Sequence, residues 1–474
     1  MLAGFAALLA VDAVASALID AIRADDLATA LRLLESGTIA ADSTERDGTT
    51  ALHVAVEHNA EGLVGRLIAA GADASAANRY GVRPLHIAAL NGNAVILGLL
   101  LEAGADPDSA LPEGETALMT AARSGNVDAL NVLLRAGANV NVREAWRGQT
   151  ALMWAAAENN PQAIARLLAA GAERDAVSAG GEFTALKFAV RAGAIEATRA
   201  LLTAGAHVEE PLDDGTSLLV LAVTNAHYEL AAVLLEYGAE PNGAAQGWTA
   251  LHQIAWSRRW NMGFNLPGPA RTGDLDSLDL VGRLVARGAD VDARQTAEPL
   301  DGNRNKLDRI GATAFLLAAK SCDLPLMRVL LDQGADPAIA TANGTTAVMA
   351  AAGVGIWAPG ENPGTHEECL GAVQLAFEVG GGDVDAINDE GDSALHGAVY
   401  RGGAIPIVEF LIERGAKLDP VNELGWMPVT AADGVEYTPA VLKRYPEAAA
   451  LLRREMAARG LEVPPSAQPG AASD

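Results

Sequence analysis

Residues 116–139 read TALMTAARSGNVDALNVLLRAGAN, and this stretch decides the fold. It opens with Thr116, and a threonine hydroxyl can cap the free N–H groups at the start of a helix. Leucine and alanine then recur at helical spacing, which predicts a buried helical face. Gly137 closes the stretch, as glycine commonly does just past the end of a helix. The stretch therefore predicts two short helices joined by a turn.

The opening of this stretch recurs along the chain. In the first copies it reads Thr-Ala-Leu, or Arg-Pro-Leu at residue 83. Its first copies start at residues 50, 83, 116, 150 and 184, at intervals of 33, 33, 34 and 34 residues. Later copies, some at wider intervals, start at Ser217, Thr249, Thr313, Thr346 and Ser393, with a weak one at Met427. A Gly-Ala pair after a leucine-rich run recurs in phase, at Gly71, Gly104, Gly137, Gly171, Gly205, Gly238, Gly288, Gly334 and Gly415. Two landmarks repeating at one period predict a solenoid of stacked units.

The repeat has the signature of a known family. With Thr50-Ala51-Leu52-His53 and Arg83-Pro84-Leu85-His86, the chain resembles the ankyrin-repeat family in a bacterial-type form. The resemblance implies an all-α repeat solenoid, curved and carrying inserted loops, whose units are helix-turn-helix pairs with β-hairpin fingers. We expect about ten full repeats and two caps. The resemblance also implies a protein-protein interaction scaffold that binds a macromolecular partner on a concave face made by the fingers and the ends of the first helices.

The repeat pattern sets the expected domain boundaries. We expect one solenoid over residues 16–460, with an N-terminal cap at 16–45 and a C-terminal cap at 422–460. Residues 461–474 are rich in Pro, Ser, Ala and Gly and are expected to be disordered. Residues 1–15 form an apolar, signal-like segment that lacks a basic start and contains Asp12. This partial signal favours a periplasmic or secreted protein, and a cytoplasmic location stays the alternative.

Composition narrows the possible partners. The chain has 60 acidic and 34 basic residues, a formal net charge of -26. This charge repels phosphate backbones, so we expect no nucleic-acid partner. No apolar run reaches the roughly 20 residues that a membrane span needs, so we expect no membrane-spanning helix. The partner is therefore expected to be a protein, and self-association into a structural assembly stays an alternative.

The repeat period is interrupted by insertions at residues 257–277, 295–310 and 353–368. The first and third separate the two helices of a repeat, whereas the second lengthens a finger. Insertions at equivalent places in nearby repeats emerge on one side, so we expect the first and third to lie together and the second on the finger edge. This arrangement predicts a local binding module. The alternative is filler, because the entropy cost of closing a loop grows slowly with its length.

Aromatic residues make up only 4% of the chain, and several fall in fingers and insertions. Amphipathic rings beside arginine often anchor partners at protein interfaces, although packing against a neighbouring finger is the alternative for each. The candidate binding residues are Tyr80, Trp146, Arg147, Phe183, Trp248, Trp256, Arg258, Arg259, Trp260, Phe264, Arg271, Trp357, His366 and Tyr400.

An enzyme or small-ligand receptor with a site between the insertions is the second hypothesis. Its candidate residues are Arg258, Arg259, Trp260, Arg271, Trp357, Glu361, His366 and Glu367. The sequence contains no phosphate-binding glycine loop, nucleophile elbow or HExxH helix, and one His beside two sequential carboxylates is a weak metal pattern. We therefore expect no catalytic residues, no metal and no cofactor. The family resemblance implies structural roles for the signature histidines, which are His53, His86, His252 and His396.

The two cysteines, Cys322 and Cys369, belong to neighbouring repeats. Cys322 is expected at the turn between two helices, and Cys369 at the start of the second helix of the next repeat. Because these places are neighbours in a stack, we predict a disulfide that pins the Trp357 loop, provided that the protein is exported to an oxidising compartment.

Overall fold

The structure is a computed structural model, and it describes residues 17–36, 41–180, 183–259, 269–299, 306–356, 363–438 and 441–465. The chain divides into two compact units, residues 1–207 and residues 208–474. Each unit is a stack of helix pairs. No helix within the described residues is long and apolar enough to cross a membrane.

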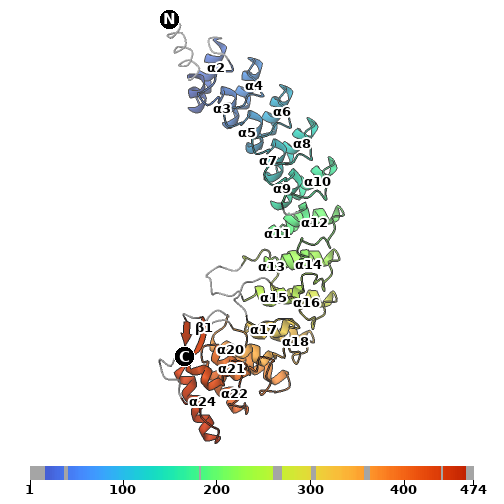
Figure 1. Cartoon of the computed structure of the whole chain (residues 1–474). Helices are drawn as coiled ribbons and strands as arrows, with labels where there is room; N and C mark the ends of the chain where they lie inside the picture. Colours follow the sequence, from blue (N-terminus) through green and yellow to red (C-terminus); the bar gives the residue numbers. More distant parts are fainter. Residues whose placement is uncertain are drawn as a thin grey trace, which may run out of the picture. The chain divides into compact units, whose positions relative to one another are not determined.

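Unit 1 (residues 1–207) has its helices in two rows (Figure 1). The first helices of the pairs are α3 (Ala51–Glu57), α5 (Pro84–Asn91), α7 (Ala117–Ser124), α9 (Ala151–Ala157) and α11 (Ala185–Ala192). The second row holds α2 (Leu27–Glu35), α4 (Glu61–Ala69), α6 (Ala94–Glu102), α8 (Val127–Arg135), α10 (Pro161–Ala169) and α12 (Ile195–Thr203). Each helix contacts its pair partner or the next helix of its own row, which is the nearest-neighbour packing of a solenoid.

Unit 2 (residues 208–474) repeats this arrangement. Its first helices are α13 (Leu218–Thr224), α15 (Ala250–Ser257), α17 (Ala314–Lys320), α19 (Ala347–Ala352), α21 (Ala394–Tyr400) and α23 (Pro428–Asp433). Its second helices are α14 (Tyr228–Glu236), α16 (Ser277–Ala286), α18 (Leu324–Asp332), α20 (His366–Val379), α22 (Ile405–Glu413) and α24 (Pro446–Ala458). An antiparallel hairpin of β1 (Val435–Thr438) and β2 (Val441–Lys443) connects α23 to α24, and the repeat pattern did not predict it.

Residues 116–139 fold as their sequence predicts. The Thr116 hydroxyl accepts a hydrogen bond from the backbone N–H of Met119, which caps α7. Gly125 ends α7 in the left-handed conformation at φ 68°. Three alanines, Leu118, Met119 and Thr120 fill the buried positions of α7, and the small alanine side chains let neighbouring helices approach closely. The core of each unit is therefore thin and continuous along the stack.

The signature histidines tie each first helix to the next finger. In the first of these repeats, Thr50 donates its backbone N–H to His53 Nδ1, and His53 Nε2 lies 3.0 Å from the Val82 carbonyl oxygen. The equivalent carbonyl partners of the other three are Ser109 for His86, Ala312 for His252 and Trp426 for His396. Burial lowers the pKa of all four rings, and that of His252 falls to about 4. Each ring is therefore neutral near pH 7 and donates through Nε2, which confirms the structural role.

Neighbouring fingers are joined by single backbone hydrogen bonds. In unit 1, Ala145 N–H donates to Glu113 and Ala179 N–H donates to Arg147. In unit 2, the corresponding pairs are Thr296 to Gly247, Ala342 to Ile310, Asp389 to Asn343 and Glu423 to Glu390. Their N···O distances lie between 2.7 and 2.8 Å. This ladder fixes the register of the fingers and therefore which finger side chains lie beside one another.

The third insertion ends earlier than expected, at Thr365 rather than Glu368. Thr365 accepts a hydrogen bond from the Glu368 N–H, and the Glu368 carboxylate accepts one from the Thr365 N–H. This reciprocal capping box starts α20 at His366. The placement of His366, Glu367 and Glu368 in a loop was therefore wrong, because all three belong to the first turn of α20.

Candidate functional site

Trp146 is the most exposed large apolar side chain of the described residues, with 79% of its surface accessible. It lies at a finger tip of unit 1, and the guanidinium of Arg147 stacks 4.5 Å from its ring centroid. The buried Glu144 carboxylate accepts hydrogen bonds from the backbone N–H groups of Trp146, Arg147 and Gln149. The finger is therefore rigid while its indole faces solvent.

Tyr80 occupies another finger of unit 1 in a similar way. Its ring is 56% exposed, and the Arg79 guanidinium lies 4.7 Å from the ring centroid and donates to the Tyr80 hydroxyl. Unit 1 thus presents two exposed rings, each covered on one side by its neighbouring arginine.

In each unit, finger residues also pair with the residue five positions later on the first helix. Gln149 accepts from Trp154 Nε1 at 2.8 Å, and Trp248 Nε1 donates to Gln253 at 3.1 Å. Phe183 packs against Phe188 with ring centroids 5.4 Å apart, and Arg191 covers both rings. Of the candidate binding residues, Phe183 and Trp248 are half-buried here. In each unit, we call the finger tips together with these paired positions the finger face of that unit.

In unit 2, Trp248 and Trp256 form a tilted pair with centroids 5.4 Å apart. Arg309, from the second insertion, lies over Trp256 at 5.2 Å and forms an ion pair with Glu298 at 2.8 Å. The second insertion thus folds back onto the end of α15, where the first insertion begins.

The second and third insertions also touch. The Lys306 N–H donates to the Gly355 carbonyl oxygen at 3.1 Å. Gly355 has φ +78°, and a Cβ there would lie 2.6 Å from Leu307, so only glycine permits this approach. Pro269 and Arg271 of the first insertion and Pro363 of the third line one open depression. The first and third insertions therefore lie together, as expected, and we call the described residues 258–259, 269–276, 295–299, 306–310, 353–356 and 363–365 the insertion cluster.

Arg258, a candidate binding residue, is largely buried and paired within the protein. Its side chain is only 19% exposed, and it forms an ion pair at 2.7 Å with Asp323, which is 2% exposed. It also donates to the Ser277 hydroxyl. Because Asp323 and Ser277 lie at the starts of α18 and α16, Arg258 joins the end of α15 to both second helices.

Arg259 has a similar fastening role. Its guanidinium donates to the carbonyl oxygen of Cys322 at 2.6 Å and forms an ion pair with Glu368 at 2.9 Å. Backbone hydrogen bonding from Thr365, and then the Arg259 guanidinium, lower the pKa of Glu368. In the same place the Sγ atoms of Cys322 and Cys369 are bonded, with a Cα–Cα distance of 4.9 Å.

The remaining candidates differ in their surroundings. Arg271 is exposed beside the depression that Pro269 and Pro363 share. His366 is exposed, and its Nε2 lies 3.2 Å from the Arg401 carbonyl oxygen. The described residues contain no group of three or more His, Cys, Asp or Glu arranged to hold a metal ion. Trp260, Phe264, Trp357 and Glu361 lie outside the described residues.

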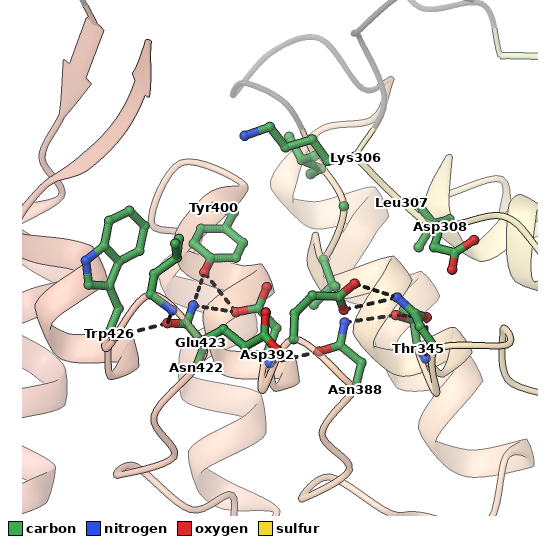
Figure 2. A pocket seen from close by; sticks show the side chains of 16 residues that line it. Lys306, Leu307, Asp308, Thr345, Asn388, Asp392, Tyr400, Asn422, Glu423 and Trp426 are labelled. Atoms are coloured by element: carbon green, nitrogen blue, oxygen red, sulfur yellow. Dashed lines mark hydrogen bonds between the residues drawn. The ribbon is translucent and has the colours of Figure 1, made fainter. Parts of the chain in front are cut away.

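Tyr400, another candidate binding residue, is only 9% exposed. Its hydroxyl donates to Asp392 at 2.9 Å and accepts from Asn422 at 3.0 Å, as Figure 2 shows. Burial, followed by the Asp392 charge, raises the pKa of Tyr400, so the hydroxyl stays protonated. The ring forms part of the wall of a pocket of about 290 Å³ in unit 2.

This pocket was not predicted from the sequence. Its wall includes Thr345, Asp392 and Trp426, which all stand directly before the cap of a first helix. Aligning the repeats by this finger position would have brought the three side chains together. Aromatic residues taken one at a time do not reveal it, because the pocket combines equivalent positions of several fingers.

Models described as ankyrin repeats match residues 60–144, 85–178, 118–211 and 186–262, and one described as an ankyrin repeat matches residues 390–423. These matches stop at residue 262 and resume at residue 390, so most of the insertion cluster falls between them. No protein with a curated description matches the chain. Because the matched residues amount to half of the sequence and contain helices α4–α15, α21 and α22, the chain belongs to the ankyrin-repeat family.

Proposed function

We propose that this chain is a binding protein that recognises a protein partner through its finger face, with the insertion cluster adding contacts in unit 2. Ankyrin repeats are generally protein-protein interaction modules, and typically not enzymes. The formal charge of -26 opposes nucleic acid as the partner, because an acidic surface gains nothing from releasing phosphate counterions.

Trp146 carries this proposal. A tryptophan that is 79% exposed on a finger held by a buried carboxylate is not needed for the packing of its own repeat. Rigid, exposed indole rings lose little conformational entropy on binding, and tryptophan is enriched among residues that dominate interface energies. The Arg147 guanidinium stacked on the ring adds hydrogen-bond donors at the same point.

The insertion cluster supports the same proposal in unit 2. Its residues are fastened by the Arg258–Asp323 and Arg259–Glu368 ion pairs and by the Cys322–Cys369 bond. A loop cluster fixed in this way offers a pre-organised surface, which lowers the entropy cost of binding.

The test is capture of partners from the native source by immobilised full-length protein. We expect Trp146→Ala to reduce capture of the specific partner at least about tenfold, because hot-spot tryptophans cost 2 kcal/mol or more when truncated. Val95→Ala is the control, since Val95 is exposed on α6 in the second-helix row of the same unit. Circular dichroism should be the same for the wild type and both variants.

If the Trp146→Ala variant still captures the partner and the Val95→Ala variant does not, binding lies on the second-helix row and the proposal is overturned. Shortening the first and third insertions together then measures what the insertion cluster adds. We expect weaker capture from the shortened protein, with the finger face of unit 1 still contributing.

A further inference from the structure

The pocket beside Tyr400 lies between the fingers that precede α19, α21 and α23 and the second and third insertions (Figure 2). Its volume of about 290 Å³ is at the lower end of the range for small-molecule sites, roughly 300–1,000 Å³. It therefore suits one amino-acid side chain better than a cofactor.

The polar side of the pocket is pre-organised by hydrogen bonds within the protein. Asp392 Oδ1 accepts from the Tyr400 hydroxyl and from Asn422 Nδ2, each at 2.9 Å. Asn343 Nδ2 donates to both carboxylate oxygens of Glu390 at 3.0 Å. These bonds hold the two carboxylates in place, and each carboxylate has more acceptor positions than the bonds from these side chains use.

The charge of the pocket favours a cation. Four carboxylates, those of Asp308, Glu390, Asp392 and Glu423, line it together with a single lysine, Lys306. Ionised carboxylates only accept hydrogen bonds, so the complementary group is a positively charged donor.

The remaining walls suit a planar cation on an aliphatic stem. Trp426 is half-buried in the wall and, among the described residues, has no guanidinium or second ring stacked on it. Elsewhere in the chain, guanidinium groups stack on exposed or half-buried rings, as in Arg79 over Tyr80, Arg147 over Trp146 and Arg309 over Trp256. Leu307, Val354 and Ile356 supply an apolar surface of the kind that covers methylene groups.

We propose that this pocket receives the side chain of an arginine in an extended segment of the protein partner. The proposal rests on the proposed function, because the pocket is built from finger residues of the face on which that partner is placed. The guanidinium lies against Trp426 and donates to Asp392, Glu390 and Glu423. Arginine fits better than lysine, because a planar fork can stack on indole and bind carboxylates with two N–H groups at once.

The test uses full-length protein with ¹⁵N-labelled tryptophan and acetyl-arginine amide as the probe. The Trp426 indole signal is assigned with Trp426→Phe. We expect the arginine probe to shift this signal saturably, whereas the neutral isostere acetyl-citrulline amide binds at least about tenfold more weakly because it lacks the charge. Nα-acetyl-lysine amide, whose side-chain ammonium is free, should bind with an intermediate affinity.

The variant Glu390→Gln/Glu423→Gln should weaken binding of the arginine probe about tenfold, because it removes two of the pocket carboxylates. Glu413→Gln, an exposed substitution on α22, is the matched control and should leave the affinity unchanged. Equal effects of both variants, or equal binding of arginine and citrulline, would overturn the arginine pocket. If a partner is captured in a Trp146-dependent way but the arginine probe does not bind, the arginine pocket is rejected and the proposed function stands. If the probe binds but no partner is captured, the proposed function is rejected and the pocket stands.

Discussion

Arg258 shows how the surroundings of a single residue separate a structural role from a binding role. In the sequence it stands beside aromatic residues and a second arginine in an insertion, which favours recognition. In the structure its partner Asp323 is almost completely buried and also accepts the Leu326 N–H at the start of α18. Removing one member of such a pair leaves the other as an uncompensated buried charge.

We therefore expect Arg258→Met to lower the free energy of unfolding by about 3 kcal/mol. Arg271→Met is the control, because Arg271 is exposed in the same insertion and should change stability by less than about 0.5 kcal/mol. Guanidinium denaturation followed by circular dichroism measures both variants. Similar losses for the two would show that the ion pair with Asp323 contributes little.

His252 makes stability depend on pH. Its folded-state pKa is about 4 because of burial, whereas an unfolded histidine titrates near pH 6.5. Between these values the unfolded chain binds more protons than the folded one, so stability is fully present above about pH 6.5 and is lost as the pH falls toward 4. The difference corresponds to about 3 kcal/mol.

Denaturation series at several pH values between 4 and 7 measure this slope. We expect His252→Gln to be less stable at pH 7 and to have a shallower slope than the wild type. His58→Gln, which changes an exposed histidine at the end of α3, is the matched control variant. A slope that is unchanged by His252→Gln would assign the acid sensitivity to other groups.

At the scale of elements, the Cys322–Cys369 bond links the turn before α18 to the first turns of α20. It closes a sequence separation of 47 residues, for which loop entropy predicts a stabilisation of about 4 kcal/mol. Protein purified without reductant should therefore give no alkylated cysteine in mass spectrometry. We expect Cys322→Ser/Cys369→Ser to unfold at lower denaturant concentration, and added reductant should affect the wild type but not this variant. Two alkylated thiols in protein from its native compartment would contradict the prediction.

The helix pairs could be predicted from sequence because each is set by local chemistry. A threonine before Ala-Leu caps a helix, and a glycine after a leucine run ends one, so few long-range contacts are needed to place α7 or α8. The same local signals located the first insertion almost to the residue, between Ser257 and Ser277.

The pocket could not be predicted in this way, because it depends on contacts between repeats. A Cβ added at Gly397, inside α21, would lie 2.7 Å from the Val354 backbone nitrogen. Because glycine has no Cβ, the third insertion can pass close to α21 at this point. Nothing in the local pattern of α21 marks this glycine as different from the alanine that would suit a helix. The burial of Tyr400 and the pairing of Arg258 with Asp323 likewise depend on residues tens of positions away.

At the scale of the whole molecule, the stacking of helix pairs determines how stability is distributed along the chain. Within each unit, the described helices contact their pair partners or row neighbours, so stability is approximately a sum of repeat terms and nearest-neighbour interfaces. A defect should therefore loosen its own repeat and the adjacent ones while distant repeats keep their structure. A globular domain of this size would instead transmit the loss to its entire core.

Leu130→Ala in α8 and Leu411→Ala in α22 test this consequence, because both leucines are fully buried, one in each unit. Each substitution leaves a cavity and should cost about 2–5 kcal/mol. Hydrogen exchange followed by mass spectrometry should show faster exchange around α6–α10 in the first variant and around α20–α24 in the second, each leaving the other region at the wild-type rate. Faster exchange along the whole chain in either variant would mean that the repeats unfold as one cooperative body, and the nearest-neighbour account would then be wrong for this protein.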